Sequence, residues 1–192
     1  MVKSIKGTQT EKNLLAAFAG ESQARNRYTY FASQARNEGY QQIANIFSET
    51  AENEKEHAKI FFSCLEGGDL EITASFPAGM IKDTSANLEA AAAGELMEWS
   101  ILYKEAAGTA EKEGFQDIAT SFKEIAEVEE FHEKRYRKLL ANLKKGEVFK
   151  KKTSVKWHCI NCGYVHKGAE APETCPACKH GRAYYELLAE NY

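Results

Sequence analysis

Apolar residues recur every three or four positions along the chain before Lys145, which is the spacing of helices that bury one face. The pattern predicts a first helix over residues 8–37, where Thr8-Gln-Thr-Glu11 fits a capping box at the start. A second helix is expected over residues 40–65, and Gly67-Gly68 ends it. Two long helices joined by a short turn therefore open the chain.

The next stretch predicts two more helices. One begins within residues 83–85 and reaches Glu113, and the other covers residues 115–143. Residues 69–82 contain Phe76-Pro77-Ala78-Gly79 and show no helical period. This stretch is too long for a tight turn, so we expect the crossover that some four-helix bundles have between their second and third helices.

Seven ionisable side chains interrupt the apolar faces of these helices. Glu54 and His57 are three residues apart, and so are Glu129 and His132, so each pair lies on one helical face. Charged groups in a core-facing stripe are costly unless something pairs with them. The complete set is Glu21, Glu54, His57, Glu95, Glu98, Glu129 and His132.

The two helical hairpins repeat each other in sequence. Phe18-Ala-Gly-Glu21 corresponds to Ala92-Ala-Gly-Glu95, and a Glu-x-x-His pair follows in each half. One such pair alone is usually solvated. A duplicated hairpin with buried acids in both halves instead predicts a dinuclear centre, as in ferritin-like di-iron and di-manganese bundles. The alternative is a repeat kept for packing alone, with the acids at helix edges.

Two tyrosines, Tyr28 and Tyr103, lie on the same faces as the acids. A phenol can donate to a ligating carboxylate and hold its orientation. The alternative is a core tyrosine whose hydroxyl reaches the surface. Position alone does not separate these two interpretations.

Composition and charge exclude several classes of function. The chain has 192 residues and a formal net charge of −3, and it has no basic stripe with interleaved aromatics, so nucleic-acid binding is not expected. No stretch approaches the roughly 20 apolar residues of a membrane helix. The first residues lack the apolar run of a secretory signal. We therefore expect a cytoplasmic protein with no membrane contact.

After Gly146 a Lys-rich connector leads to two Cys-x-x-Cys motifs separated by twelve residues. In a chain expected to keep its thiols reduced, this spacing indicates four thiolates on one metal rather than disulfides. Zinc would make the unit a structural ribbon, whereas iron would make it a one-electron relay, and the spacing accepts both. The four cysteines are Cys159, Cys162, Cys175 and Cys178. The fifth cysteine, Cys64, is expected to be a buried, inert thiol.

The whole chain closely resembles the rubrerythrin family, a ferritin-like bundle followed by a rubredoxin-like unit. The matching phrases are Phe18-Ala-Gly-Glu-Ser-Gln-Ala-Arg-Asn-Arg-Tyr28, Glu130-Phe-His-Glu-Lys-Arg135 and Cys162-Gly-Tyr-Val-His166. One departure is Lys179, where simple rubredoxins have glycine after the second motif. The resemblance implies a di-iron bundle over residues 1–146, a linker over 147–156 and a rubredoxin-like iron domain over 157–192.

The resemblance also implies how the bundle holds two non-haem irons with oxo and carboxylate bridges. Glu54 and Glu129 would bridge the irons, and Glu21 and Glu95 would be terminal ligands. His132 would bind the iron held by Glu95. A third iron would sit among the four cysteines, with zinc as a possible substitute.

Four residues are implied to be catalytic: Glu98, His57, Tyr28 and Tyr103. Glu98 would bind the second iron in the diferric state and His57 would replace it in the diferrous state. This exchange is reasonable because carboxylates suit Fe(III) and neutral imidazole suits Fe(II). The two tyrosines match family positions that donate hydrogen bonds to the ligating carboxylates.

The implied reaction is a peroxidase reaction that protects against oxidative stress by reducing hydrogen peroxide to water. Electrons would enter through the four-cysteine iron from a rubredoxin or an NAD(P)H-dependent rubredoxin reductase. No Gly-rich nucleotide fingerprint occurs, so NADH is not expected to bind directly. The family arrangement is a head-to-tail homodimer that places one subunit's sulfur site against the other's di-iron site.

Two rival functions stay open at this point. A ferroxidase or iron-handling bundle would leave the cysteine unit unexplained, and rapid peroxide turnover with a reductase would separate it from the peroxidase. A non-catalytic bundle with a structural zinc ribbon would be colourless and would carry zinc at the cysteines.

Overall fold

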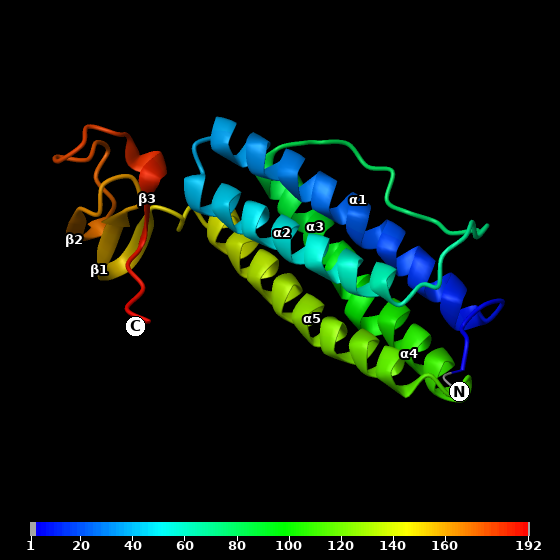
Figure 1. Cartoon of the computed structure of the whole chain (residues 1–192). Helices are drawn as coiled ribbons and strands as arrows, with labels where there is room; N and C mark the ends of the chain where they lie inside the picture. Colours follow the sequence, from blue (N-terminus) through cyan, green and yellow to red (C-terminus); the bar gives the residue numbers. More distant parts are fainter. Residues whose placement is uncertain (1–2, 192) are drawn as a thin grey trace.

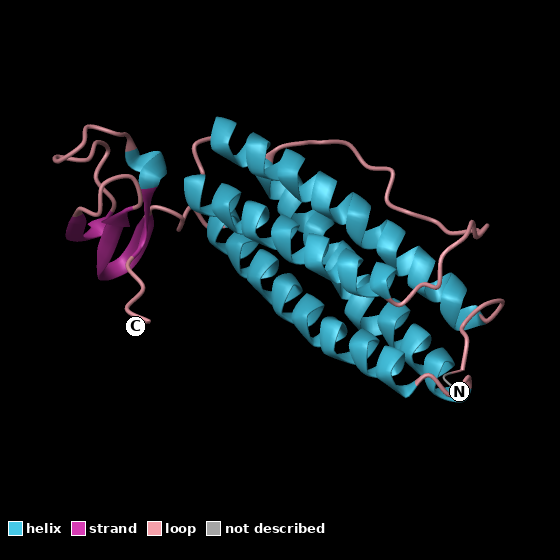
Figure 2. Cartoon of the chain, viewed as in Figure 1, coloured by secondary structure: helices cyan, strands magenta, loops and turns pink. Residues whose placement is uncertain are grey.

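The computed structural model describes residues 3–191 and places a bundle of long helices beside a small sheet (Figure 1). The helical elements are α1 (Gln9–Asn37), α2 (Gln41–Ser63), α3 (Thr84–Met97), the π-helical segment η1 (Glu98–Leu102), α4 (Tyr103–Lys112) and α5 (Gln116–Lys144). α3, η1 and α4 run on without a break and form one rod (Figure 2). The predicted ferritin-like four-helix bundle is therefore confirmed.

Residues 64–83 form the predicted crossover between α2 and α3. This segment returns along the length of the bundle, so that α3 begins at the same end as α2 (Figure 1). Asp83 then caps α3, because its carboxylate accepts the backbone N–H of Ala86 at 2.8 Å. The crossover sets the direction of α3, and so it determines that the acid-bearing faces of both hairpins point into one bundle interior.

The start of α1 forms only part of the predicted capping box. The Thr8 hydroxyl accepts the backbone N–H of Glu11 at 3.2 Å, as expected. The Glu11 carboxylate, however, accepts the N–H of Gly7 at 2.8 Å. A positive φ of 77° at Gly7 marks the turn that brings this N–H over the helix end.

The π-helical segment η1 differs from the single α-helix expected between residues 83 and 113. A π turn accommodates an extra residue and is frequently found at functional sites. Sequence positions locate this extra residue. Tyr28 follows Glu21 by seven positions, whereas Tyr103 follows Glu95 by eight. The insertion between the two repeats therefore falls in the interval that contains η1.

Two apolar clusters fill the bundle on either side of the buried acids. The cluster toward the α1–α2 turn includes Tyr28, Phe31, Ile43, Phe47, Leu88, Tyr136 and Leu140. The cluster toward the other end includes Leu14, Phe61, Tyr103, Phe115, Phe122 and Ile125. The acids are thus enclosed by apolar packing rather than placed at helix edges.

The C-terminal unit is a three-stranded antiparallel sheet in the order β2-β1-β3, formed by β1 (Lys150–Cys159), β2 (Val165–Glu170) and β3 (Tyr185–Leu187). A short 3-10 helix, η2 (Arg182–Tyr184), precedes β3. Residues 150–156, expected as linker, belong to β1 instead. Lys150 pairs with Glu170 across the strands at 2.5 Å, which extends the hairpin beyond the cysteines.

The sheet unit packs against the turn between α1 and α2. The rings of Tyr40 and Phe149 stack with centroids 6.1 Å apart and planes 8° from parallel. A side chain at Gly39 would meet Ala183 at 3.7 Å, so the two parts touch there. The cysteine unit thus lies beyond one end of the bundle within a chain (Figure 1). None of the helices in residues 3–191 has the length and apolar character needed to cross a membrane.

Candidate metal centre

Six of the seven predicted ligands meet between the two apolar clusters. α1 contributes Glu21, α2 contributes Glu54 and His57, α3 contributes Glu95, and α5 contributes Glu129 and His132. All six side chains are buried. They form two overlapping groups of possible metal ligands, one with Glu21 and His57 and one with Glu95 and His132. Both groups share Glu54 and Glu129.

Glu54 and Glu129 each face both imidazoles. The two carboxylate oxygens of Glu129 lie 2.8 Å from His57 Nδ1 and 2.8 Å from His132 Nδ1, respectively. Those of Glu54 lie 2.8 Å from His57 Nδ1 and 3.3 Å from His132 Nδ1. A carboxylate with one oxygen toward each of two sites has the shape of a bridging ligand.

Glu21 and Glu95 each face only one imidazole. Glu21 Oε1 lies 3.9 Å from His57 Nδ1, and Glu95 Oε2 lies 3.8 Å from His132 Nδ1. The repeat seen in the sequence thus becomes a pseudo-twofold arrangement in space. Each half has one outer carboxylate and one imidazole, and the two inner carboxylates lie between the halves.

The protonation equilibria of this cluster show how strongly it attracts positive charge. Burial and the nearby charge of Glu54 raise the pKa of Glu95 to about 8. Burial acts against the charged form of His132, but contacts with Glu129, Glu54 and Glu95 outweigh it and raise the pKa to about 12. Burial likewise raises the pKa of Glu21, with the charge of Glu129 adding to it.

The hydrogen bonding of the cluster is incomplete in a way that fits bound cations. Within residues 3–191 several buried donor and acceptor atoms have no hydrogen-bond partner: Glu21 Oε2, Glu54 Oε1, Glu95 Oε2, both carboxylate oxygens of Glu129, and His132 Nδ1. Orphaned buried groups of this kind are costly. A pair of metal ions bound by carboxylate and imidazole satisfies all of them at once.

The two predicted tyrosines contact carboxylates of the opposite hairpin. The Tyr28 hydroxyl donates to Glu95 Oε1 at 2.5 Å, and the Tyr103 hydroxyl donates to Glu21 Oε1. Both phenols are buried. Each therefore fixes the orientation of one outer carboxylate, and neither reaches the surface.

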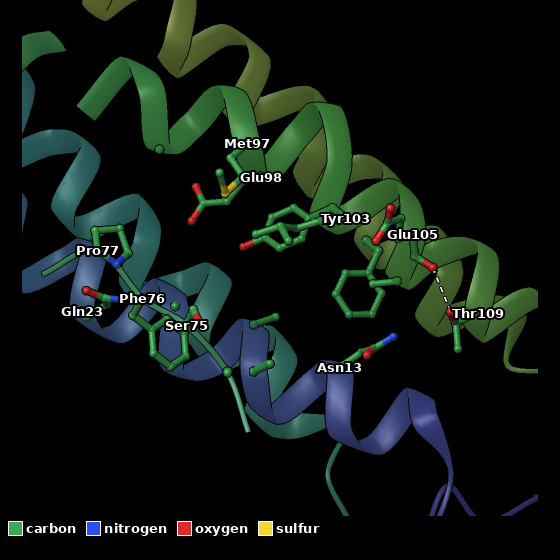
Figure 3. Close-up of a pocket in the computed structure, with 18 of the residues that line it drawn as sticks. Asn13, Gln23, Ser75, Phe76, Pro77, Met97, Glu98, Tyr103, Glu105 and Thr109 are labelled. Atoms are coloured by element: carbon green, nitrogen blue, oxygen red, sulfur yellow. Dashed lines mark hydrogen bonds between the residues drawn. The ribbon is translucent and has the colours of Figure 1, made fainter. Parts of the chain in front are cut away.

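Glu98 is the one predicted ligand that the structure leaves outside both groups. It begins η1 and lines a cavity beside the acid cluster, which Figure 3 shows together with Tyr103. Its side chain is partly buried, and its carboxylate lies at one end of this cavity (Figure 3). Desolvation and the charge of Glu95 raise the pKa of Glu98 well above that of a free carboxyl. His57 lies within one of the two ligand groups, and Glu98 lies at the edge of the cluster.

The four cysteines converge as the sequence predicts. Their sulfurs lie within 4.8 Å of one another, at 3.8 Å for Cys159–Cys178 and 3.7 Å for Cys162–Cys175. A tetrahedral metal with sulfurs at about 2.3 Å separates them by about 3.8 Å. All four are free thiols rather than disulfides. The cage therefore has the dimensions of a tetrathiolate metal site.

The two cysteine turns share one backbone shape despite the lysine in the second. Gly163 has a φ of 81° and donates to the Cys159 carbonyl at 2.8 Å. Lys179 has a φ of 63° and donates to the Cys175 carbonyl at 2.9 Å. The second turn thus adopts the left-handed conformation without glycine, at a cost of about 1–2 kcal/mol.

Lys179→Gly is expected to raise the unfolding free energy of the sheet unit by up to about 1 kcal/mol, because relief of the left-handed strain exceeds the added chain entropy. Thermal or denaturant unfolding of the full chain, followed at the cysteine chromophore, measures this. Lys167→Gly in β2 is the matched control and should destabilise the unit. A less stable Lys179→Gly chain would contradict the strain argument.

Cys64, the cysteine outside the cage, follows α2 at the end of the bundle away from the sheet unit. It is half-buried against the cluster that contains Phe61, and burial raises the pKa of its thiol. A thiol with a raised pKa is poorly nucleophilic. The structure gives it a packing role only.

A ferritin-like bundle with paired Glu-x-x-His ligands and an appended tetrathiolate unit defines a class, the di-iron redox proteins with their own rubredoxin-like site. The family model "Rubrerythrin" matches residues 12–140, and "Rubrerythrin, rubredoxin-like domain" matches residues 157–186. The chain belongs to the rubrerythrin family. It accordingly carries a di-iron site with carboxylate and histidine ligands and a rubredoxin-like four-cysteine site.

Similar proteins cover the whole chain. A rubrerythrin from Porphyromonas gingivalis is 62% identical over 192 residues, covering 100% of this chain and 96% of its own. A rubrerythrin from Nitratidesulfovibrio vulgaris is 57% identical and covers 100% of both chains. A solved structure of fully reduced, all-ferrous nigerythrin has a TM-score of 0.64 at 29% identity, covering 97% of this chain and 92% of that one. Membership in this family makes the chain a redox enzyme.

Proposed function

We propose that this chain is a non-haem di-iron peroxidase that reduces hydrogen peroxide to water and protects the cytoplasm from oxidative stress. One observation carries the proposal. A cavity reaches Glu98 and Tyr103, and the Tyr103 hydroxyl donates to Glu21 inside the buried acid cluster. A small oxidant thus has a route to the metal pair, which a purely structural site would not need.

The proposal divides the chain into a di-iron unit at residues 1–146 and an electron-entry unit that contains residues 157–192 and, as the start of β1, residues 150–156. The family matches to residues 12–140 and 157–186 fall inside the two units. In the first unit Glu54 and Glu129 would hold both irons between them, Glu21 and Glu95 would each bind one iron, and His132 would bind the iron held by Glu95. The support for this assignment is the pattern of distances around the two inner carboxylates.

His57 and Glu98 are proposed as alternative ligands of the second iron: His57 would bind it in the reduced state and Glu98 in the oxidised state. In this structure His57 lies among the ligands, 2.8 Å from both inner carboxylates, and Glu98 lies at the edge of the cluster. This matches the arrangement proposed for the reduced pair, since neutral imidazole suits Fe(II). The wide turn of η1 carries Glu98 and gives its backbone a different path from that of an α-helix.

The metal pair, when reduced, supplies the two electrons that peroxide reduction requires, and the protein controls position and protons. Tyr28 and Tyr103 hold Glu95 and Glu21 in the orientation needed for binding. The Glu98 carboxyl lies at the cavity, and desolvation and the charge of Glu95 raise its pKa, which favours its proposed role as proton donor to the oxygen that leaves as water. The apolar clusters on both sides exclude other solvent from the site.

Electrons are proposed to enter at the four-cysteine iron from a rubredoxin or an NAD(P)H-dependent rubredoxin reductase. The cysteine unit lies beyond the α1–α2 turn of its own chain, and an apolar cluster separates that turn from the acids (Figure 1). A head-to-tail homodimer would place the partner's cysteine unit nearer the metal pair. Sedimentation of the purified chain tests this part of the proposal directly.

Peroxide turnover by the iron-loaded full chain tests the proposed activity. With excess rubredoxin and reductase, NADH oxidation should depend on hydrogen peroxide and consume one NADH for each peroxide. The zinc-loaded chain is the control and should be inactive. Turnover no faster than that of the zinc form would contradict the proposal. Slow formation of an iron mineral would favour the iron-handling alternative. Zinc at the four cysteines, in protein purified from the organism that makes it, would favour the structural zinc ribbon.

Glu98→Ala is expected to leave metal content largely intact and to slow peroxide turnover by about 10–100-fold, the size of effect seen when groups that support a metal site are removed. The reason is that Glu98 lies outside the ligand groups in this structure and acts only during the reaction. Metal analysis and steady-state NADH oxidation measure the two effects. Glu105→Ala, at the opposite end of the cavity, is the matched control. Unchanged turnover would refute the exchange role.

A further inference from the structure

The cavity beside the metal centre is much larger than hydrogen peroxide requires. It has a volume of about 610 Å³ and lies between α1, the rod of α3, η1 and α4, and crossover residues 74–77. A water molecule occupies about 30 Å³ in the liquid, so a molecule with two oxygens needs about 60 Å³. The space is about tenfold greater and falls within the range of sites for organic ligands.

Small side chains on two helices create this space. α1 presents Ala16, Ala17 and Gly20 to the cavity, and α4 presents Ala106. A side-chain carbon at Gly20 would meet only the Phe76 ring, at 3.9 Å. The crossover therefore covers the cavity from outside and does not fill it. Longer side chains at these α1 positions would occupy the interior.

The lining of the cavity is apolar along its walls and polar at both ends. In Figure 3 the carboxylate of Glu98 and the hydroxyl of Tyr103 point toward the same end, which is the end next to the metal ligands. Apolar walls come from Phe76, Met97, Leu102 and Phe122. The opposite end is marked by Asn13, Glu105 and Thr109. The apolar walls suit the apolar body of a molecule whose polar head lies at the Glu98 and Tyr103 end.

Three of these apolar wall side chains are exposed at the mouth of the cavity. Phe76, Met97 and Leu102 are 42%, 55% and 47% exposed, respectively. All three belong to segments that border the cavity rather than to the bundle core. An apolar compound would meet them on entry and gain burial as it passes inward. Hydrogen peroxide has no apolar surface of its own to bury against these side chains.

We propose that the chain also reduces organic hydroperoxides, ROOH, whose apolar group R occupies this cavity while the O–O head lies at Glu98 and Tyr103. This inference rests on the proposed peroxidase function and names a wider substrate class for the same site. The apolar walls bind R, and the polar end orients the head toward the metal ligands. Alcohols ROH of the same shape bind as products.

The reaction balances as ROOH + 2 e⁻ + 2 H⁺ → ROH + H₂O. The O–O bond breaks, the oxygen bonded to carbon keeps R and takes one proton, and the other oxygen leaves as water. The two electrons come from the reduced metal pair under the proposed function, with the rubredoxin system as the external reductant. Glu98 lies at the end of the cavity where the leaving oxygen needs its proton.

Binding can be measured without turnover. Calorimetric titration of the oxidised, iron-loaded full chain with 2-phenyl-2-propanol, the product from cumene hydroperoxide, should show saturable binding of one molecule per chain. Ala16→Leu places an isobutyl group in the cavity and should weaken this binding about tenfold or more, because one carbon too many in a hydrophobic pocket costs about 10–200-fold. Ala19→Leu, on the same helix but outside the cavity lining, is the matched control and should bind normally.

Turnover then tests the substrate class. Ala16→Leu should lower kcat/KM for cumene hydroperoxide about tenfold or more, while kcat/KM for hydrogen peroxide stays within about twofold. Thr109→Leu, at the far end of the cavity, gives a second variant if the first does not fold. Absence of alcohol binding to the unchanged chain would overturn the proposal, as would reduction of hydrogen peroxide but not cumene hydroperoxide. Alcohol binding without reduction of either peroxide would refute the peroxidase function instead.

Discussion

Glu129→Gln is expected to empty the buried site of metal and to reduce peroxide turnover to background. Glu129 places one oxygen 2.8 Å from each imidazole, so the amide removes the negative charge that faces both metal positions and the donor oxygen of one of them. Contacts with His132 and His57 outweigh burial and lower the pKa of Glu129, which keeps the carboxylate ionised in the cluster. The loss should exceed the roughly 10–100-fold effect of removing a supporting group.

Metal analysis and steady-state turnover of the full chain measure this effect. Glu130→Gln is the matched control, since Glu130 is the next residue on α5 and pairs with Lys134 outside the site. It should keep all of its iron. The four-cysteine iron should persist in both variants, because that cage shares no residue with the bundle. A fully loaded, active Glu129→Gln chain would show that the inner carboxylates do not bridge the metals.

Much of the bundle can be predicted from the sequence because the same helical spacing identifies both the buried helix faces and the candidate metal ligands. The spacing that predicts a buried face also places Glu21, Glu54, Glu95 and Glu129 on it, and charged groups there require partners. The duplication adds the pseudo-twofold arrangement. The cysteine cage is predictable for a similar reason, since four thiolates at this spacing need few other assumptions.

The parts that sequence left undetermined depend on which groups meet across the bundle. Tyr28 belongs to the first hairpin but donates to Glu95 of the second, and Tyr103 makes the reverse contact with Glu21. Helical spacing identifies a face but not its partner on another helix. The same limit applies to Glu98, which shares the spacing of a ligand and yet lies at the cavity.

One unexpected element did leave a trace in the sequence. The offset between the two repeats changes from 74 residues for Glu21 and Glu95 to 75 for Tyr28 and Tyr103. An added residue inside a continuous helix must widen a turn, and η1 lies in this interval. The chain thus keeps both tyrosine contacts. In the second repeat only, the backbone at Glu98 leaves the α-helical geometry.

Cys175→Ser is expected to remove the four-cysteine iron and to stop turnover that depends on a rubredoxin or reductase. Cys175 is fully buried in the small core with Trp157 and Tyr185. A unit of this size buries too little apolar surface to be stable alone, so the metal contributes much of its folding free energy. We therefore expect the sheet unit to lose its order together with its iron, and its visible colour and near-ultraviolet dichroism to disappear.

The bundle of the Cys175→Ser chain should keep its metal pair, because none of the bundle ligands lies in the sheet unit. Chemical reduction followed by one addition of hydrogen peroxide should still oxidise the pair once, while NADH-driven turnover falls to the level without enzyme. Cys64→Ser is the control and should retain both activities, since Cys64 packs only against the bundle core. Sustained NADH-driven turnover by Cys175→Ser would mean that electrons reach the metal pair directly, and the small unit would then be a structural appendage rather than the point of electron entry.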